Sequence, residues 1–414
     1  MSATNWSGNL TYSTNPRDIH SIEQLKDHIH TADHVKVIGS RHSFNDIADS
    51  SSLLLSLQHL NQIVEIDSEK QTVTVEAGIR YGDLALALNQ AGYALHNLAS
   101  LPHISVVGAC ATGTHGSGVH NGNLATAVAG LSFITGTGEQ VHLNRADNAD
   151  IFSGLVVNLG ALGIVTHITL DIMPTYQVQQ NVYVDLPIEQ LKQNFDEIMA
   201  LGYSVSAFTD WQGDTVNQLW IKSKDDAPLA LDALDAIPAT RNYHPIDDVS
   251  PENCTVQQGI WGDWHERLPH FQMAFSPSKG DELQSEYFVD RAVAAQAISA
   301  LQSIGDIIKP VLLVSEIRCI AADDLWLSPC YQRDSMAFHF TWQQDWNAVR
   351  DVLLAIEQAL APFAPRAHLG KLFTMPIADI RASYAKFSDF QQLVQLYDPH
   401  GKFQNRYLKA LLWD

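Results

Sequence analysis

The chain has 414 residues, of which 25 are Lys or Arg and 46 are Asp or Glu, so its formal net charge is -21. That balance argues against nucleic acid as the main partner and against docking on an anionic membrane, because both need a basic surface. Hydrophobic residues make up 46% and charged residues 17%, which is typical of a globular chain. The length predicts about two or three domains.

The charge is unevenly distributed along the chain. Residues 84–138 contain no Asp, Glu, Lys or Arg, although the chain on both sides is acidic. Gly, Ser, Thr, Asn and Pro interrupt this segment, and it has no run of about 20 apolar residues, so it does not fit a membrane span. We expect a buried segment that packs against another part of the molecule.

The start of the chain lacks a basic region followed by an apolar one, so we expect no signal peptide and a cytoplasmic protein. The cysteines form no CxxC pair and are too sparse for a disulfide scaffold. We expect buried, reduced thiols at all four positions: Cys110, Cys254, Cys319 and Cys330.

The 18 histidines make a metal site one hypothesis. His28, His30 and His34 lie close together, but His28 and His30 fall on different faces of a predicted helix. No carboxylate or cysteine spacing completes a zinc site, so we expect no metal and interpret these histidines as solvated helix residues.

Hydrophobic periodicity predicts strands and helices that do not follow a simple βαβ alternation, which favours an α+β fold. Ser21 and Gln24 form a capping-box pattern at the first helix. The predicted elements in chain order are a helix over 21–32, a strand over 34–39, a polar loop over 40–46, a strand over 53–57, a hairpin of 63–67 with 72–78, a helix over 81–91, a hairpin around 136–138, and a helix, turn and strand within 149–174.

The composition changes near residue 176, where Trp, Asp and Pro become frequent and the Gly-rich character fades. We therefore place a domain boundary near residue 175. Residues 225–255, rich in Asp, Ala and Pro, are expected to form a long surface excursion. The chain contains no internal repeat and no low-complexity tract.

Two Gly-rich, uncharged segments, 39–45 and 112–118, have a composition suited to phosphate binding. Glycine lets main-chain N–H groups approach an anion closely, and successive N–H groups can surround it. Neither segment is a nucleotide signature alone, because there is no GxxxxGK[ST] loop and 113–118 has the wrong spacing for GxGxxG. Ordinary Gly-rich turns are the alternative.

His42 lies in the first of these segments, in a small polar loop after a predicted strand. A neutral imidazole at that place could act as a base, as a hydrogen-bond donor or as a nucleophile toward a cofactor. A purely structural histidine is the alternative.

The C-terminal half contains a second group of polar residues. If VLLVSEIR is a strand, Glu316 and Arg318 lie on one face of it, and His339 and Thr341 likewise share a face of the next. Lys371 follows a glycine. Charges in apolar strands are costly unless paired, so this pattern indicates either a buried salt-bridge cluster or a wall that binds a polyol or an acid.

Several motifs together resemble the vanillyl-alcohol-oxidase-type flavoproteins. They are the segments Val37–Asn45, Val75–Leu84, Ala111–Gly116 and Asp398–Asn405. Within that group the chain is most similar to the bacterial alditol oxidases, also called xylitol oxidases. The diagnostic stretches are Asn97–His103, Phe208–Trp211, Trp264–His270 and Glu282–Tyr287, and the resemblance extends over essentially the whole chain.

The resemblance implies a two-domain α+β fold that binds FAD. An FAD-binding domain would span 1–175 and a substrate-binding cap domain, with a mixed or antiparallel sheet and flanking helices, 176–370; residues 371–414 would return to the first domain. His42 would be bonded covalently to the flavin 8α-methyl group. The other FAD-binding residues that the resemblance implies are Val37, Ile38, Gly39, Ser40, Arg41, Ser43, Ser100, Ser105, Gly108, Thr112, Gly113, Thr114, His115 and Val165.

The activity that the resemblance implies is oxidation of the C1 primary alcohol of xylitol, sorbitol and similar polyols to the aldose. Hydride would pass to flavin N5, and dioxygen would be reduced to hydrogen peroxide. The implied substrate-side residues are Ser100, Glu316, Arg318, His339, Thr341 and Lys371.

Charge suggests a role for each of these side chains. Ser100 and Glu316 would hydrogen-bond the polyol hydroxyls, and either His339 or Lys371 would polarise or deprotonate the C1 hydroxyl. Arg318 or Lys371 would stabilise developing negative charge. The expected partners are a polyol and dioxygen, with the protein as a monomer.

Arg41 departs from the family pattern, which has glycine before the flavin-linked histidine. If that position needs a positive φ, Arg41 costs about 1–2 kcal/mol, which a contact with the FAD pyrophosphate would offset. Two alternative functions stay open: an aldonolactone oxidoreductase of the same superfamily, and a flavin- or sugar-binding protein without turnover. The preferred polyol does not follow from the sequence, because stereochemistry is decided by the placement of a few hydrogen bonds.

Overall fold

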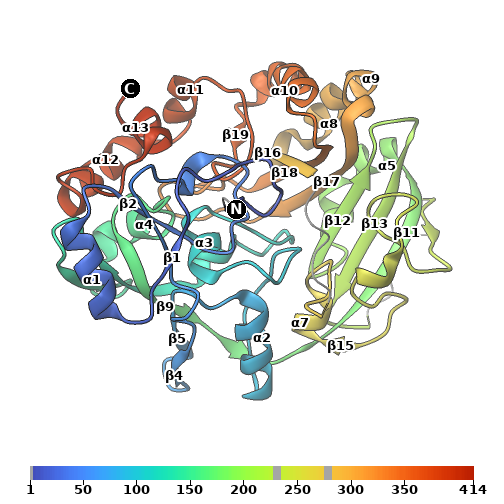
Figure 1. Ribbon diagram of the computed structural model, residues 1–414. Coiled ribbons are helices and arrows are strands. Elements are labelled where there is room, and N and C mark those ends of the chain that lie inside the picture. The colour runs from blue at the N-terminus through green and yellow to red at the C-terminus, as the bar shows by residue number, and fades with distance from the viewer. Residues whose placement is uncertain (1–2, 227–234, 275–281) are drawn as a thin grey trace.

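The computed structural model describes residues 3–226, 235–274 and 282–414. Figure 1 shows the N-terminal strands and the C-terminal helices on one side of the molecule and a large sheet on the other. The architecture is α+β, as the sequence predicts. In the described part of the chain, we find no helix that is both long enough and apolar enough to cross a membrane.

The N-terminal part contains a small parallel sheet and an antiparallel sheet. Strands β1 (Arg17–Asp18), β3 (Leu53–Ser56) and β2 (Val35–Ile38) form the parallel sheet in that order. The antiparallel sheet has the order β4 (Ile63–Asp67), β5 (Thr72–Glu76), β9 (Ile164–Asp171), β7 (Val128–Ile134) and β8 (Gln140–Asn144). A short pair joins β6 (Tyr93–Ala94) to β10 (Met173–Pro174).

Four α-helices belong to the described residues of this part. They are α1 (Ile22–Thr31), α2 (Tyr81–Gln90), α3 (Val106–Ala111) and α4 (Ala149–Val156). The Ser21 side chain caps α1 by accepting a hydrogen bond from the Gln24 N–H, which satisfies a backbone donor that the helix cannot. Leu25 and Ile29 form the buried stripe of that helix, so the predicted helix and its cap are confirmed.

The second part is built on a nine-stranded antiparallel sheet. Its main path is β14 (Ile237–Pro238), β11 (Gln177–Pro187), β13 (Thr215–Ser223), β12 (Ser204–Thr209), β17 (Leu312–Ile320), β18 (Ser335–Gln343), β16 (Glu282–Asp290) and β19 (Arg366–Ala367), with β15 (Gly262–Asp263) paired to β11. The accompanying helices are α5 (Ile188–Gln193), α6 (Phe195–Met199), α7 (Trp264–Arg267), α8 (Ala294–Gln302), α9 (Gly305–Ile308) and α10 (Trp346–Leu360).

The two faces of this sheet differ in chemistry because successive side chains point to opposite sides. One face is apolar and packs against α5, α6, α8 and α10; on β18 it carries Phe338, Phe340 and Trp342. The alternate positions, His339 and Thr341 among them, line a cavity on the other face.

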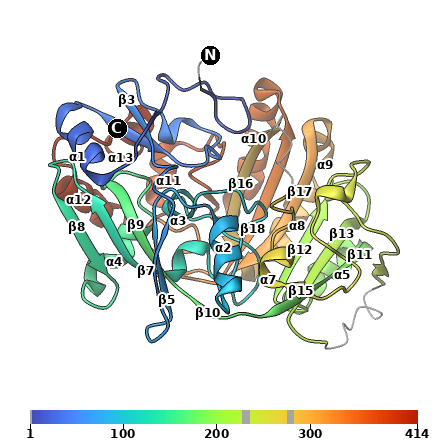
Figure 2. The ribbon, with the colours of Figure 1, turned by 60° about the horizontal axis from the view of Figure 1, so that its bottom comes forward.

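The C-terminal helices lie beside the N-terminal elements, as Figures 1 and 2 both show. These helices are α11 (Ile377–Ala382), α12 (Phe387–Tyr397) and α13 (Arg406–Leu412). Phe390, Leu408 and Leu411 belong to the same hydrophobic core as Phe152 of α4. We therefore propose the domain limits 1–175, 176–370 and 371–414, with the last segment completing the first domain.

The surface excursion expected over 225–255 lies partly outside the described residues, because 227–234 are not among them. In its described remainder the regular elements are β14 and a 3-10 turn over Pro251–Asn253. The four cysteines are buried and free, as expected.

The Asn405 side chain links the C-terminal helix α13 to residues 46–49 near the N-terminus, so its removal should destabilise the protein. Its side chain caps α13 through the Leu408 N–H and donates to the carbonyls of Asp46 and Asp49. Asn405→Ala removes the cap and the hydrogen bonds that the side chain donates to these carbonyls, so we expect the Tm to fall by about 3–8 °C. Differential scanning fluorimetry measures this. Ser21→Ala is the matched control, because it removes only a helix cap, and an equal fall in both variants would contradict the expectation.

Candidate active site

A cavity of about 1090 Å³ lies between the N-terminal loops and the inner face of the large sheet. This volume is slightly above the usual range for small-molecule sites and suits a large cofactor together with a substrate. The lining includes every FAD-side residue expected from the sequence except Gly113, and every expected substrate-side residue. Gly113 instead has a φ of +68°, and a Cβ there would lie 3.1 Å from Pro329.

The loop after β2, residues 39–44, lines the cavity and packs closely against neighbouring segments; we call it the cradle. A Cβ on Gly39 would lie 2.2 Å from Ser105 Oγ, so any larger residue there would force Ser105 to move. Ser40 Oγ accepts a hydrogen bond from the Ser105 N–H at 2.9 Å, which joins the loop to the segment that begins α3. Phe44 N–H donates to the Gly370 carbonyl, which ties the loop to the residue before Lys371.

Arg41 has a φ of 63°, so the position does require the left-handed conformation that glycine adopts freely. Its guanidinium donates to the carbonyl of Thr4 at 3.4 Å, in the N-terminal segment. The strain at Arg41 is therefore accompanied by a contact within the protein chain itself.

His42 lies in this cradle with both ring nitrogens buried, and neither has a hydrogen-bond partner among the described residues. Its ring stacks on Trp6, with centroids 5.1 Å apart and an angle of 22° between the planes. Burial, with smaller contributions from His103 and Arg41, lowers the pKa of His42 to about 4. The imidazole is thus neutral at physiological pH and keeps a lone pair on an unpaired, cavity-lining side chain.

The opposite wall consists of polar side chains arranged in rows across three strands. Glu286 of β16 pairs with His339 of β18, and His339 pairs with Glu316 of β17, so these three lie side by side. Because the side-chain period of a strand is two, Arg318 and Thr341 belong to neighbouring rows on the same face. The expectation that Glu316 shares a face with Arg318, and His339 with Thr341, is confirmed.

Each of the two buried carboxylates has cationic or N–H partners. Glu286 accepts from Lys371 Nζ at 2.9 Å and contacts His115 Nε2 at 3.0 Å. Burial alone would raise the pKa of Glu286, but Lys371 and His115 outweigh it and hold that pKa well below its usual range.

Glu316 contacts Arg318 at 3.1 Å and His270 Nε2 at 2.8 Å. Burial would raise the pKa of Glu316 too, but Arg318 and His270 outweigh it and bring that pKa far below its usual range. Both carboxylates are therefore ionised, and the side chains in question form a buried salt-bridge cluster, one of the two alternatives considered from the sequence, which also lines the cavity.

His339 is a buried imidazole between the two carboxylates. Burial, followed by the charge of Lys371, lowers the pKa of His339 well below its usual range, so the ring is neutral. Its Nε2 lies 3.0 Å from Gln284 Oε1, an acceptor, which places the ring proton on Nε2 and leaves Nδ1 as the basic nitrogen.

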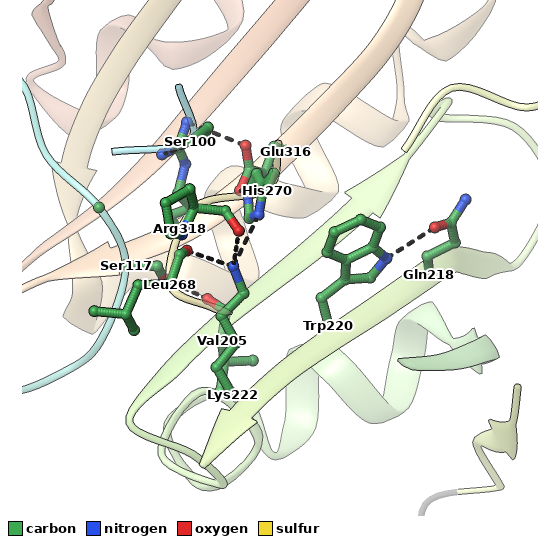
Figure 3. Close-up of polar contacts among 12 residues, drawn as sticks. Ser100, Ser117, Val205, Gln218, Trp220, Lys222, Leu268, His270, Glu316 and Arg318 are labelled. Carbon is green, nitrogen blue, oxygen red and sulfur yellow. Dashed lines mark hydrogen bonds and ion pairs between the residues drawn. The ribbon is translucent and has the colours of Figure 1, made fainter. Parts of the chain in front are cut away.

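Four polar residues of this region were not singled out individually from the sequence: Lys222, His270, Gln284 and Glu286. Gln284 and Glu286 alternate in ELQSEYF in the same way that Glu316 and Arg318 alternate in VLLVSEIR, so the same pattern could have identified them. His270 lies outside any strand, and its contact with Glu316 joins residues far apart in sequence. Figure 3 shows Lys222 extending toward His270, with Glu316 beside His270 and with Arg318 and Ser100 close by.

Comparison with known proteins identifies the family. Residues 18–144 match the family model described as FAD binding domain, and residues 277–411 match that of D-arabinono-1,4-lactone oxidase. The chain is 45% identical to an alditol oxidase from Streptomyces sp., over 99% of this chain and 98% of that protein. It is 25% identical to L-gulonolactone oxidase from Bos taurus, over 92% and 90% of the two chains.

The fold agrees with that assignment. The structure of glucooligosaccharide oxidase from Acremonium strictum, described as carrying a 6-S-cysteinyl, 8α-N1-histidyl FAD, superposes with a TM-score of 0.76 at 14% identity, over 99% of this chain and 94% of that one. The chain therefore belongs to the alditol oxidase family of FAD-dependent, vanillyl-alcohol-oxidase-type oxidoreductases.

Proposed function

We propose that this protein oxidises the C1 primary alcohol of alditols such as xylitol and sorbitol to the aldose, with dioxygen reduced to hydrogen peroxide. One observation carries the proposal: a wall of hydrogen-bonding and charged groups faces the same cavity as the cradle of His42. A polyol presents only hydroxyl groups, and this wall offers both fixed acceptors and fixed donors. The 45% identity to an alditol oxidase over the whole chain supports the same substrate class.

The cradle side of the cavity fits FAD. The unpartnered, buried nitrogens of His42, in a side chain that lines the cavity, are a feature that a bound flavin nucleotide would explain. We propose that Ser40, Ser105 and Thr114 line the cofactor and that His42 carries it covalently. When bound, FAD supplies the two-electron acceptor that the alcohol oxidation needs and passes those electrons to dioxygen.

The wall residues then have distinct proposed roles. His339 is neutral and takes the hydroxyl proton at Nδ1. Lys371, held against Glu286, and Arg318, whose Nε has no partner among the described residues, stabilise negative charge on the reacting oxygen. Glu316 and Ser100 bind further hydroxyls. Different side chains of the wall thus remove the proton, stabilise the negative charge and orient the substrate.

Covalent attachment through His42 can be tested by mass. We expect the denatured wild-type protein to carry one FAD by mass spectrometry and His42→Ala to carry none, because the only proposed linking atom is lost. His103→Ala is the matched control: His103 also lines the cavity, but its Nε2 contacts the Met273 carbonyl. An unmodified mass for the wild type would refute the covalent linkage.

Substrate class can be tested by peroxide formation. With xylitol, sorbitol and mannitol as substrates, we expect peroxide to form at a substantially higher kcat/KM than with a sugar lactone. The reason is that the wall has paired acceptors and donors for several separate hydroxyls. A higher kcat/KM for the lactone would favour the aldonolactone alternative, which the 25% identity to L-gulonolactone oxidase makes the second candidate.

Substitution of His339, the proposed base, distinguishes an enzyme from a protein that binds flavin or sugar without turnover. His339→Ala should slow flavin reduction by polyol roughly 10²–10⁴-fold under anaerobic stopped-flow conditions, and Lys371→Ala should also reduce it strongly. Because the pKa of His339 is depressed, it stays deprotonated as the pH falls through about 6.5, so the wild-type rate should persist below that pH. Unchanged reduction in both variants would contradict these roles.

A further inference from the structure

Lys222 is a buried lysine whose role the catalytic proposal leaves unexplained. It lies on β13, and its side chain is almost completely buried. The ammonium group donates to the carbonyls of Leu268 at 2.5 Å and Pro269 at 3.0 Å, and it lies 3.2 Å from His270 Nδ1. Figure 3 shows it pointing from its strand toward these groups. Three partners match the three N–H donors of an ammonium group.

The two partners of His270 together determine which of its nitrogens carries the proton. Burial lowers the pKa of Lys222 to about 7, and in its ammonium form the side chain can only donate, so His270 Nδ1 then accepts. In a neutral imidazole the proton then resides on Nε2, which lies 2.8 Å from Glu316 Oε1. The N–H donates to the carboxylate. The opposite tautomer would place two acceptors against each other at that distance.

The surroundings hold the His270 ring in this orientation. Phe208 and Trp220 contact it edge to face, with ring centroids 5.5 and 5.2 Å away. Its backbone N–H donates to the Ser100 carbonyl at 3.1 Å. Burial, followed by the charge of Lys222, lowers the pKa of His270 to about 4, in agreement with a neutral ring.

We propose that Lys222 and His270 are positioning residues that fix the orientation of the Glu316 carboxylate toward the polyol. Glu316 Oε1 accepts from His270 and Oε2 contacts Arg318, so each oxygen keeps a lone pair for a substrate hydroxyl. Neither Lys222 nor His270 needs to touch the reacting carbon. The inference rests on the proposed function and adds a determinant of polyol recognition to it.

The tautomer itself can be measured in the holoenzyme without any substrate. In long-range ¹H–¹⁵N spectra of protein labelled at histidine, the His270 signals are identified by their absence from His270→Gln. We expect the Nε2–H tautomer in the wild type. Lys222→Met should keep that tautomer, because Glu316 still accepts from Nε2–H, but it should move the Nδ1 signal toward that of an imidazole nitrogen without a hydrogen bond. A wild-type Nδ1–H tautomer, or an unchanged Nδ1 signal in Lys222→Met, would overturn the role of Lys222.

The consequence for substrate binding is measured by anaerobic flavin reduction over a range of xylitol concentrations. His270→Leu should raise the apparent dissociation constant roughly tenfold or more while changing the limiting rate by less than about threefold, because orientation of a binding group is lost. His270→Gln, whose amide N–H can replace Nε2–H, should stay within about threefold of the wild type. His265→Leu is the matched control, since His265 does not line the cavity.

Two results of the substrate-binding experiment would overturn the proposal. One is an equal loss of xylitol affinity in His270→Leu and His270→Gln, which indicates a packing role alone. The other is no loss of xylitol affinity in His270→Leu. The absorbance spectrum and covalent flavin content of each variant show whether the cofactor site has stayed intact. If no polyol reduces the wild-type flavin, the proposed function fails by itself, and the tautomer measurement still decides the Lys222–His270 relation.

Discussion

The structure depends on the burial of two ionised carboxylates, Glu286 and Glu316, on the inner face of one sheet. A buried charge without partners costs several kcal/mol and would become protonated instead. Arg318 lies on the same strand as Glu316, and the other partners come from outside the two strands that carry the carboxylates. Lys371 arrives from the segment after β19, His115 from the uncharged N-terminal segment, and His270 from the loop after α7. Satisfying these charges also brings the two parts of the molecule together around the cavity.

The two walls of the cavity then have opposite electrostatic character. The segment 84–138 contributes Ser105, Thr114 and other neutral groups, with no charged side chain in 55 consecutive residues. In a protein of net charge -21, this keeps carboxylates away from the place where an anionic dinucleotide is proposed to lie. The buried ion pairs Glu286–Lys371 and Glu316–Arg318 lie on the sheet wall, where negative charge would develop on a reacting oxygen. The uncharged stretch is thus part of the site and not merely a buried linker.

Local structure could be predicted well from the sequence, because its causes are local. The cap of α1, the β4–β5 hairpin and the alternation in β17 and β18 all depend on residues within a few positions of one another. The same alternation in ELQSEYF marks Gln284 and Glu286, although no role followed from it until the strand pairing was known. The positive φ of Arg41 could be anticipated only because the family pattern places glycine there.

Local sequence patterns do not predict which buried side chains contact one another. Glu286 and Lys371 are 85 positions apart, and His270 and Glu316 are 46 apart. Such pairs are determined by strand order and by loops that cross between elements, and neither leaves a periodic signal. Lys222 is the clearest case: in TVNQLWIKS it resembles an ordinary strand-end lysine, and only its burial beside His270 distinguishes it.

The hydrogen-bond polarity of the wall matters because a polyol hydroxyl can both donate and accept. A wall of freely rotating groups would adapt to any arrangement of hydroxyls and would discriminate poorly between them. In this site Nε2 of His270 and Nε2 of His339 each face an acceptor, the Glu316 carboxylate and the Gln284 carbonyl oxygen. Glu316 and Glu286 are held as acceptors by Arg318 and Lys371. Because each group is held in one donor or acceptor state, a substrate must supply the complementary hydroxyls in the matching order, and selectivity can follow without any hydrophobic contact to the polyol.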